Sequence, residues 1–471
     1  MKIKLGLHPE TMENVALYCD GTLVGKNREF EYVCTDSREV DEKTLFVATL
    51  GERVDGHNFI PSAQSLGGRC FLCERIPDGA DEDSSFCVVG DSVAAFASLA
   101  RGYRKNTPID TVAITGSVGK TTTKELTACV LSEGFKLYST EGNFNSVIGM
   151  PMSMLEVGGD CEAAVFEMGM SGFGEIRQMS LAATPQIAAI TNIGTSHLEY
   201  LGTRENIAKA KYEITEGLRA GGKLILNGDE PLLCEFAKND CERDFDVLFA
   251  SVNGNGDFCA ENIRFNSDSS IFDLKYSGGK IENISVPAIG LHIVYDALFA
   301  CSIGLLMGLG GEQIKRGIAK YTPKAYRQRI YDAGGFKIIA DCYNASPESV
   351  KSALDVLAGL DGKRKIAVLG DMRELGEHSV QLHREVGNFA AEKKIDILLT
   401  VGELGRAISE GAMSGGMSEE NVFSELDESA RSTVKTLKDI IADGDIILFK
   451  ASRAMKFERI IEQIENTEQD S

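Results

Sequence analysis

The sequence contains no tryptophan and no apolar run that approaches the ~20 residues a membrane-spanning helix needs. Its first ten residues, MKIKLGLHPE, have neither the apolar stretch nor the small-residue cleavage site of a secretory signal. Internal repeats and low-complexity segments are also absent. We therefore expect a cytoplasmic protein with no membrane span.

Positive charge is scarce, because 49 Lys and Arg residues face 70 Asp and Glu residues and leave a net charge of −21. Binding to nucleic acid requires a basic face that neutralises phosphates. The composition therefore argues against nucleic acid as a partner. Any anionic substrate has to be held by a few local groups.

Disulfides and zinc are not expected, although the chain has twelve cysteines. The cysteines are scattered and often lie inside apolar stretches, as reduced cysteines do. Cys70 and Cys73 form a C-x-x-C motif, but a second pair and a nearby histidine are missing. Burial in a strand is the favoured interpretation of GRCFLCE, and zinc binding is the alternative.

The length of 471 residues, with 43% apolar and 25% charged residues, suggests about three soluble globular domains. We predict boundaries at 1–105, 106–322 and 323–471, and we interpret the polar stretch Arg101 to Pro108 as a linker. The first domain has short strands and small helices, which predicts a smaller α/β domain. We expect α/β folds throughout.

Apolar runs alternate with helical segments in the second and third domains. The runs of the second domain are TVAIT, AAVFEMG, QIAAITNIG and KLILNGD, and those of the third are KIIADCY, KIAVLGD, DILLTVG and DIILFKA. Near-continuous apolar strands are typical of parallel sheets covered on both faces. Ser346 is a candidate cap for a helix that begins at Pro347. In such sheets ligands bind beyond the carboxyl ends of the strands.

The segment TVAITGSVGKTTTKE, from Thr111 to Glu125, has the pattern of a phosphate-binding loop between a strand and a helix. Glycine turns and helix N-termini point backbone N–H groups at an anion, Lys120 adds a positive charge, and the Thr121 hydroxyl is suited to Mg²⁺. The first glycine comes late, at Gly116, where the usual loop has one at position 114. We favour binding of a nucleoside triphosphate over an ordinary turn.

Several polar residues follow the predicted strands of the second domain, namely Glu167, Asn192, His197 and Asp229. A buried carboxylate such as Glu167 needs a partner, either a cation or backbone N–H groups. A lone histidine is more often structural, but the position of His197 at the edge that carries the phosphate loop favours a ligand role.

Two lysines of the predicted helix ENIAKAKYEITEGLR fall on different faces. At about 100° per residue, Lys209 shares a face with glutamates and is expected in solvent. Lys211 is in line with Ile207, Ile214 and Leu218. A lysine on an apolar stripe extends its amine to solvent, pairs with an anion or is chemically altered.

Taken together, these motifs resemble those of the Mur ligases, the ATP-dependent amide-forming enzymes of peptidoglycan and cell wall synthesis. The shared blocks are TGSVGKTTTKE, FEMG, ITNIGTSHLEYLG and the A-K-x-E-I at 210–214. TDSREV, FVATLGERVDGHNFI, IADCYNASPES, AVLGDMRELGEHSVQLHREVG and LFKASRAMKFE resemble the branch that adds D-alanyl-D-alanine. The blocks span nearly the whole chain. The resemblance implies a central domain of the phosphate-loop type and a Rossmann-like third domain.

The resemblance also implies a set of nucleotide and metal residues. The ATP phosphates would be bound by Gly116, Ser117, Val118, Gly119, Lys120, Thr121 and Thr122. Magnesium would be held by Thr121, Glu167, His197 and Lys211, the last as a carbamate formed with CO₂. Arg329 and Asp341 would face the nucleotide from the third domain, and Asp296 would lie on the adenine side. Lys120, Lys211, His197 and Arg329 would be the catalytic residues.

Substrate residues are implied in the same way. Ser37 and Arg38 would bind the UDP-sugar end of UDP-N-acetylmuramoyl-tripeptide. The family motif N-x-N-N appears as Asn143, Phe144, Asn145 and Ser146, so one amide is missing. The D-alanyl-D-alanine side would be formed by Asn344, Ala345, Ser346, Lys450 and Arg453.

Other positions depart from the family pattern. The H-N-x-x-N motif becomes His292, Ile293 and Asp296, which leaves the base contacts open because a carboxylate accepts but does not donate. Ala451 replaces the glycine of K-G-S-R.

The implied reaction joins UDP-N-acetylmuramoyl-tripeptide to D-alanyl-D-alanine through an acyl phosphate and yields ADP and phosphate. We expect a monomer whose third domain rotates about a hinge near Tyr321 to Arg329. The alternatives are a sibling ligase, which would add a single amino acid or extend folate with glutamate, and a nucleotide-dependent switch without an amine acceptor. The third residue of the tripeptide and the base for the incoming amine stay open.

Overall fold

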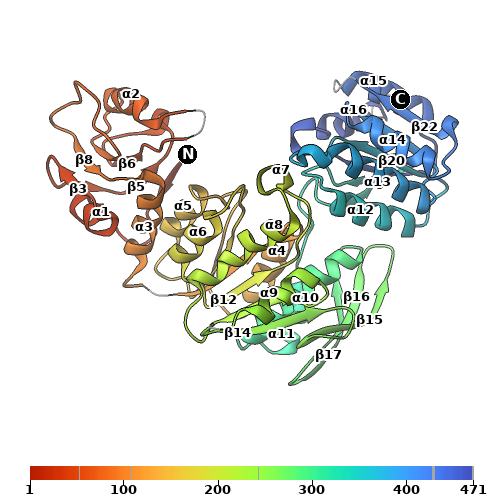
Figure 1. Ribbon diagram of the computed structural model, residues 1–471, viewed down its shortest axis with the longest axis horizontal. Helices are drawn as coiled ribbons and strands as arrows, with labels where there is room; N and C mark the ends of the chain where they lie inside the picture. The colour runs from red at the N-terminus through yellow and green to blue at the C-terminus, as the bar shows by residue number, and fades with distance from the viewer. Residues whose placement is uncertain (52–53, 108, 242, 427–429, 469–471) are drawn as a thin grey trace.

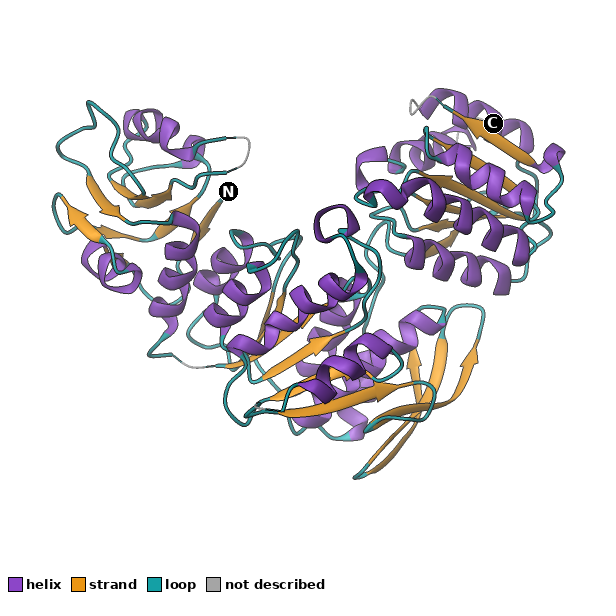
Figure 2. Ribbon diagram, in the orientation of Figure 1, coloured by secondary structure: helices purple, strands orange, loops and turns teal. Residues whose placement is uncertain are grey.

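The computed structural model describes residues 1–51, 54–107, 109–241, 243–426 and 430–468. It has three α/β domains arranged along an arc, with the central domain between the other two (Figure 1). Helices cover the sheets of the central and C-terminal domains (Figure 2). The prediction of the fold class is confirmed. The domain boundaries near residues 105 and 322 stay predictions.

The N-terminal domain has a mixed sheet with the strand order β1-β5-β6-β7-β8-β3. Its strands are β1 (Lys2–Lys4), β3 (Thr22–Val24), β5 (Tyr32–Cys34), β6 (Thr44–Val47), β7 (Cys70–Cys73) and β8 (Ser85–Val88); β2 (Glu10–Thr11) pairs with β4 (Glu29–Phe30). Its helices are α1 (Met12–Cys19), α2 (Ile60–Ser65) and α3 (Ser92–Arg104). Cys70 and Cys73 are buried in β7, as predicted, and all twelve cysteines are free.

The predicted linker begins too early, because α3 runs through Arg101 to Arg104. Tyr103 is buried, and its hydroxyl accepts hydrogen bonds from the backbone of Leu7 and His8. Arg104 is also buried, and its guanidinium donates to the carbonyl of Val157 at 2.8 Å. The polar composition of RGYRKNTP therefore hid the last turn of a packed helix. Pro108 lies outside the described residues.

The central domain contains a sheet with the order β10-β11-β9-β12-β13-β14-β15-β16-β17. Its strands are β9 (Asp110–Thr115), β10 (Leu137–Ser139), β11 (Ala163–Glu167), β12 (Ile187–Ile190), β13 (Lys223–Asn227), β14 (Asp246–Ser251), β15 (Phe258–Phe265), β16 (Ser270–Tyr276) and β17 (Gly279–Val286). Its helices are α4 (Lys120–Leu131), α5 (Gly149–Glu156), α6 (Glu175–Ala183), α7 (Leu198–Leu201), α8 (Arg204–Tyr212), α9 (Pro231–Asn239), α10 (Leu291–Leu306) and α11 (Gly311–Ala319).

Strands β10 to β15 are parallel, and β15 to β17 form an antiparallel extension. Ala113 belongs to the apolar core on one face of the sheet, whereas Val112 and Ile114 belong to the core on the other. Because both faces are covered, the strand reads as a continuous apolar run. Parallel pairing brings the carboxyl ends of β9, β11, β12 and β13 to one edge, and the site lies there.

The C-terminal domain has the strand order β18-β19-β23-β20-β21-β22. Its strands are β18 (Arg329–Asp332), β19 (Lys337–Ala340), β20 (Lys365–Gly370), β21 (Ile397–Val401), β22 (Val422–Glu425) and β23 (Ile446–Lys450). Its helices are α12 (Pro347–Gly359), α13 (Ser379–Glu392), α14 (Gly405–Ser414), α15 (Ala430–Ile440) and α16 (Glu458–Glu468). Ser346 caps α12 and accepts from the Ser349 N–H, as predicted.

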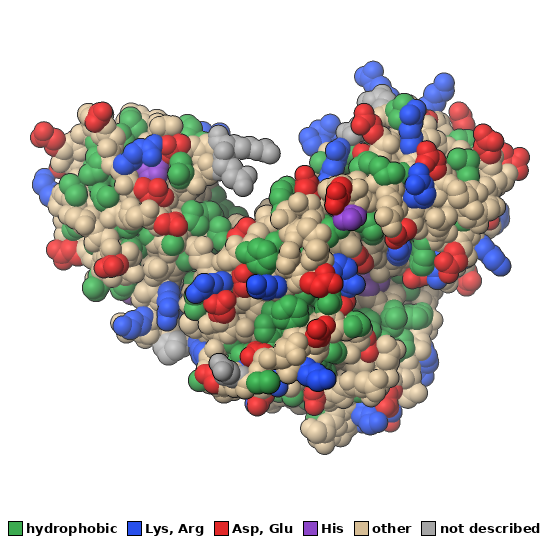
Figure 3. Space-filling view, viewed as in Figure 1, with side chains coloured by type: hydrophobic (Ala, Val, Ile, Leu, Met, Phe, Trp, Pro, Cys, Tyr) green, Lys and Arg blue, Asp and Glu red, His purple; other side chains and the backbone are tan. Residues whose placement is uncertain are grey.

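The described part of the chain contains no helix with the length and apolar character required to cross a bilayer. Lys and Arg side chains are dispersed among Asp and Glu on the face shown in Figure 3 and do not gather into a basic patch there.

Candidate active site between the central and C-terminal domains

The phosphate loop connects β9 to α4 and requires glycine at two positions. Gly116 has φ +155°, and a Cβ there would lie 1.9 Å from Thr191 Oγ1. Gly119 has φ +85°, and a Cβ there would lie 2.3 Å from Asp296 Oδ1. A side chain at position 116 would collide with Thr191 at the end of β12. The close approach of these two segments therefore requires glycine at this position.

The end of β12 fixes the loop in place. Asn192 Oδ1 accepts from the Val118 N–H, and Asn192 Nδ2 donates to the Val118 carbonyl, both at 2.9 Å. Thr191 Oγ1 donates to the same carbonyl at 2.7 Å. The role of Asn192 is thus to hold the backbone of the loop.

Lys120 is the first residue of α4, and its Nζ donates to the carbonyl of Gly116 at 2.8 Å. Burial lowers the pKa of Lys120, while the negative charge of Glu167 raises it. The amine is therefore at the loop and close to carboxylates, where it can receive a phosphate group.

Glu167, the last residue of β11, is 2% exposed. Its Oε1 accepts from Asn145 Nδ2 at 2.7 Å and from Thr121 Oγ1 at 3.2 Å. Its Oε2 is buried without a hydrogen-bond partner among the described residues. An unpaired buried carboxylate oxygen is costly, and a cation would satisfy it.

Lys211 lies in α8, which ends at Tyr212 and continues as a 3₁₀ turn (Glu213–Gly217). Its side chain is 1% exposed on the same stripe as the buried Ile207 and Ile214. Lys209 is exposed, with Nζ 6.0 Å from the centre of the Phe173 ring. The predicted contrast between the two lysines is present. Burial lowers the pKa of Lys211 well below its usual value, and the charge of Lys120 adds to this effect.

His197 precedes α7 and has φ +66°. Its Nδ1 lies 2.6 Å from Glu374 Oε2, which comes from the loop after β20 in the C-terminal domain. The described residues contain no group of three or more His, Cys, Asp and Glu side chains that could hold a metal ion. Thr121 and Glu167, which are in contact at 3.2 Å, and His197 are the candidate ligands for a magnesium ion, which usually takes its other ligands from water and phosphates.

A cavity of about 1180 Å³ opens between the two domains at this edge of the sheet. Of the predicted site residues, those that line it are Ser117, Val118, Gly119, Lys120, Thr121, Thr122, Asn145, Glu167, His197, Asp296, Asp341, Asn344, Ala345, Ser346 and Lys450. Those outside its lining are Gly116, Asn143, Lys211, Arg329, Arg453, Ser37 and Arg38.

The placement of Arg329 differs from the expectation that it faces the nucleotide. Arg329 is exposed on β18, with its guanidinium 5.0 Å from the Tyr331 ring centre. Arg327 lines the cavity instead, and its charge contributes to the lowered pKa of Lys120. The sequence has two arginines here, in the motif R-Q-R at 327–329. The pattern alone does not show which of the two guanidinium groups lines the cavity. Tyr343, also unpredicted, lines the cavity between Arg327 and Arg453.

The carboxyl of Asp296 contacts the phosphate loop, and its expected place on the adenine side stays a prediction. Its Oδ1 accepts from Thr123 Oγ1 at 3.0 Å and abuts Gly119. Burial raises the pKa of Asp296 well above its usual value. The side chain thus supports the loop through Thr123 and through its contact with Gly119.

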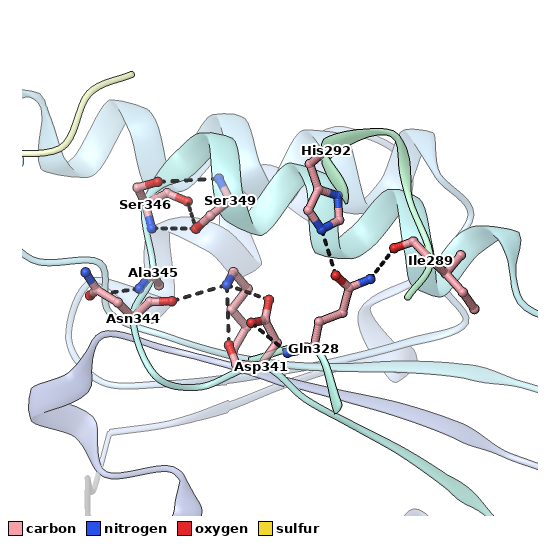
Figure 4. A network of polar contacts seen from close by, with 9 residues as sticks. Ile289, His292, Gln328, Asp341, Asn344, Ala345, Ser346 and Ser349 are labelled. Atoms are coloured by element: carbon pink, nitrogen blue, oxygen red, sulfur yellow. Dashed lines mark hydrogen bonds and ion pairs between the residues drawn. The ribbon is translucent and has the colours of Figure 1, made fainter. Parts of the chain in front are cut away.

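The segment before β18 joins the two domains through the network in Figure 4. Gln328 Oε1 accepts from His292 Nε2 at 2.7 Å, and Gln328 Nε2 donates to the Ile289 carbonyl. Asp341 Oδ1 accepts from the Gln328 N–H at 3.2 Å. Lys450 Nζ donates to Asp341 Oδ2 at 2.7 Å.

Lys450 is 3% exposed, and its amine also donates to the carbonyl of Asn344 at 3.2 Å. The pair of Lys450 and Asp341 therefore fixes the loop from Asn344 to Ser346, which precedes the N-terminus of α12. Arg453 pairs with Glu458 at 3.0 Å.

Ser37 and Arg38 lie in a 3₁₀ turn (Ser37–Glu39) of the N-terminal domain. Asp36 caps this turn, and its Oδ2 accepts from Arg38 Nη2 at 2.5 Å. Asn143 is exposed and contacts Asn145 through the backbone. The structure does not bring these residues into the cavity.

Comparisons with known proteins cover almost the whole chain. Three family models match: the Mur ligase family catalytic domain at residues 29–104, the Mur ligase middle domain at 114–304 and the Mur ligase glutamate ligase domain at 327–453. The UDP-N-acetylmuramoyl-tripeptide–D-alanyl-D-alanine ligase of Bacillus subtilis strain 168 is 36% identical over 96% of this chain and 98% of its own.

Solved structures agree with the sequence comparisons. MurF from Acinetobacter baumannii matches with a TM-score of 0.89 and 28% identity, over 98% of this chain and 99% of that one. The MurF ligase of Thermotoga maritima in complex with ADP matches with a TM-score of 0.82 and 28% identity, over 93% and 98%. The chain therefore belongs to the Mur ligase family and, within it, to the MurF branch.

Proposed function

We propose that this chain joins UDP-N-acetylmuramoyl-tripeptide to D-alanyl-D-alanine and hydrolyses ATP to ADP and phosphate, as a step of peptidoglycan synthesis. Full-length similarity to ligases of that name carries the proposal. The cavity supports it, because the phosphate loop and the Asn344 to Ser346 loop line one space. A sibling ligase matches less well, since the folylpolyglutamate synthase of Mycobacterium tuberculosis has 14% identity.

The nucleotide is proposed to bind with its phosphates on Gly116 to Thr122. Lys120 and the backbone N–H groups at the start of α4 are positioned for this, and the Thermotoga maritima relative was solved with ADP. Magnesium is proposed to lie on Thr121, Glu167 and His197, where it would neutralise phosphate charge. The buried Oε2 of Glu167, which has no hydrogen-bond partner among the described residues, supports this assignment.

Lys211 is proposed to carry a carbamate. The neutral amine is the form that reacts with CO₂, and the lowered pKa of Lys211 favours that form. The product is an anion on the buried stripe. It would compensate the positive charge of Lys120 nearby.

ATP is needed because a carboxylate is a poor electrophile. We propose that a carboxylate oxygen of the tripeptide attacks the γ-phosphorus and releases ADP. The ammonium group of D-alanyl-D-alanine loses one proton to water or a base, and the amine attacks the acyl carbon. The C–O bond to phosphate breaks, and the nitrogen loses a second proton and keeps the third as the amide N–H. Lys120 and Arg327 lie where charge develops on the transferred phosphoryl group, so their contribution is electrostatic.

The remaining substrate contacts are proposals as well. Ser37 and Arg38 would hold the UDP-sugar end, and Asn143 and Asn145 the segment that leads to the reacting carboxylate. The dipeptide would lie at Asn344, Ala345 and Ser346, with Lys450 fixing that loop and Arg453 beyond it. Asp341 would act through Lys450.

We also propose that the protein is a monomer and acts in the cytoplasm. All twelve cysteines are free and seven of them are buried, which suits a reducing compartment.

The test is phosphate release measured over a matrix of UDP-sugar peptides and acceptors, with products identified by mass spectrometry. We expect ADP, phosphate and a new amide only when the tripeptide and D-alanyl-D-alanine are both present. Use of a single amino acid instead would indicate a sibling ligase. Slow ATP hydrolysis with no acceptor dependence would indicate a switch, and AMP with pyrophosphate would overturn the mechanism.

A further inference from the structure

The loop Asp371 to Gly376, which holds D-M-R-E-L-G, reaches from the C-terminal domain to the central domain. The Glu374 carbonyl accepts from the Glu199 N–H in α7 at 3.1 Å. A Cβ on Gly376 would lie 3.1 Å from the Glu199 Cα, so the two backbones are in close contact. The Glu374 side chain meets His197 at the start of the same helix. The proposed reaction gives this loop no role so far.

Three successive residues of the loop form hydrogen bonds with the rest of the C-terminal domain. Asp371 Oδ1 accepts from the Gly405 N–H at 2.9 Å. The Met372 N–H donates to His383 Nε2, and the Arg373 N–H donates to Ser452 Oγ, each at 2.9 Å. These bonds fix the loop to the C-terminal domain. The loop therefore moves together with that domain.

Both ring nitrogens of His383, which accepts from the loop, have hydrogen-bond partners. His383 is fully buried, and its Nδ1 lies 2.6 Å from the Ser379 carbonyl. Since that carbonyl only accepts, Nδ1 carries the proton and Nε2 is the acceptor for Met372. The loop therefore rests on a neutral ring with one tautomer.

Both residues of the contact have left-handed backbone conformations, with φ +66° at His197 and +64° at Glu374. Such conformations are uncommon and strained outside glycine, so they persist where the surroundings impose them. The two side chains are thus presented to each other from opposite sides of the domain boundary.

The chemistry of the pair matches that of a metal-ligating histidine. A ring nitrogen that donates to a carboxylate leaves the other nitrogen as the acceptor, and histidines that bind metals are usually oriented in this way. Nδ1 of His197 lies 2.6 Å from Glu374 Oε2 and has no hydrogen-bond partner of full geometry among the described residues, so Glu374 is the acceptor within its reach. Nε2 is then left for a cation, and His197 lines the cavity.

We propose that Glu374 is a positioning residue that orients His197 across the domain boundary, so the cation site is complete only when the C-terminal domain is docked. This inference rests on the proposed function, in which His197 is a magnesium ligand. Glu374 then couples domain closure to metal binding. It does not touch the reacting atoms.

The test is Mn²⁺ binding, measured by electron paramagnetic resonance on the full chain with ADP. Glu374→Ala is expected to weaken Mn²⁺ binding about 10-fold or more, as loss of such a partner commonly does. Glu374→Gln should recover part of that loss, because its amide oxygen is an acceptor at the position that the carboxylate oxygen occupies, 2.6 Å from Nδ1. Glu377→Gln is the matched control, because Glu377 is 91% exposed on the same segment, and should bind Mn²⁺ like the parent.

A double-variant cycle separates positioning from a structural effect. If Glu374 acts through His197, then Glu374→Ala added to His197→Ala weakens Mn²⁺ binding no further. Parental Mn²⁺ affinity in Glu374→Ala, or additive losses in the double variant, would overturn the inference. In those cases, a parent chain that still forms the amide would leave the proposed function intact. Melting temperatures of all variants show whether each one is folded.

Discussion

The guanidinium carbon of Arg327 lies 3.9 Å from the centre of the Tyr343 ring, and both residues line the cavity that the phosphate loop also lines. A cation over an aromatic face is held electrostatically. The flanking residues Tyr326 and Gln328 have φ values of +63° and +52°. Because the backbone bends here, Arg327 lines the cavity whereas Arg329, two residues later, is exposed on β18.

The first prediction compares these two arginines. Arg327→Ala is expected to lower kcat by about 10²–10³, the size of loss seen when a donor at a developing charge is removed. Arg329→Ala should stay within about twofold of the parent, because its side chain is exposed on β18. The measurement is steady-state phosphate release with all substrates present. Equal losses in both variants would restore Arg329 to the site.

How much of this site follows from the sequence depends on the kind of feature. The phosphate loop, the strand-end positions of Glu167 and His197 and the buried face of Lys211 follow from apolar runs and helical period. Those patterns record local geometry and burial. They predicted the central sheet well.

Features that depend on two distant segments were not predictable. The partner of His197 is Glu374, which is 177 residues further along the chain, and no periodicity links the two. The same holds for the contact of the Asp296 carboxyl with Gly119, which is far away in the sequence. Arg327 was missed because positive φ values at non-glycine residues do not show in a sequence.

The second prediction concerns Lys211. Lys211→Ala should lose most activity and leave ATP binding largely intact, because the side chain lies outside the cavity lining. Small carboxylates added to this variant should restore part of the turnover if a carbamate is what is missing. Lys209→Ala, on the exposed face of the same helix, is the control and should behave like the parent. Full activity in Lys211→Ala would remove the carbamate from the mechanism.

The third prediction concerns the pH dependence of stability at Asp296. Its pKa is raised in the folded protein, so between the unfolded and the folded pKa the folded state holds a proton that the unfolded state has released. Stability then falls as the pH rises through that window, by up to about 1.4 kcal/mol per pH unit. Asp296→Asn keeps an oxygen that accepts from Thr123 and removes the titration.

We therefore expect Asp296→Asn to raise the melting temperature relative to the parent at pH 8, with a smaller difference at pH 5. Thermal unfolding at the two pH values measures this. Thr433→Val, a buried change in another domain that does not titrate, controls for general effects of pH. A difference that is the same at both pH values would show that Asp296 does not titrate in this range.

The last prediction concerns the hinge between the central and C-terminal domains. Gln328 bridges His292 and the carbonyl of Ile289, and it is buried directly before β18. Because an acyl phosphate reacts with water, the site has to open for loading and close for chemistry. We expect the C-terminal domain to rotate when all ligands bind, and small-angle scattering should show a change in the radius of gyration.

Gln328→Ala removes both side-chain bonds and should widen the spread of domain positions without ligands, while the closed state keeps the contact between His197 and Glu374. The same radius of gyration with and without ligands in the parent chain would contradict the rotation.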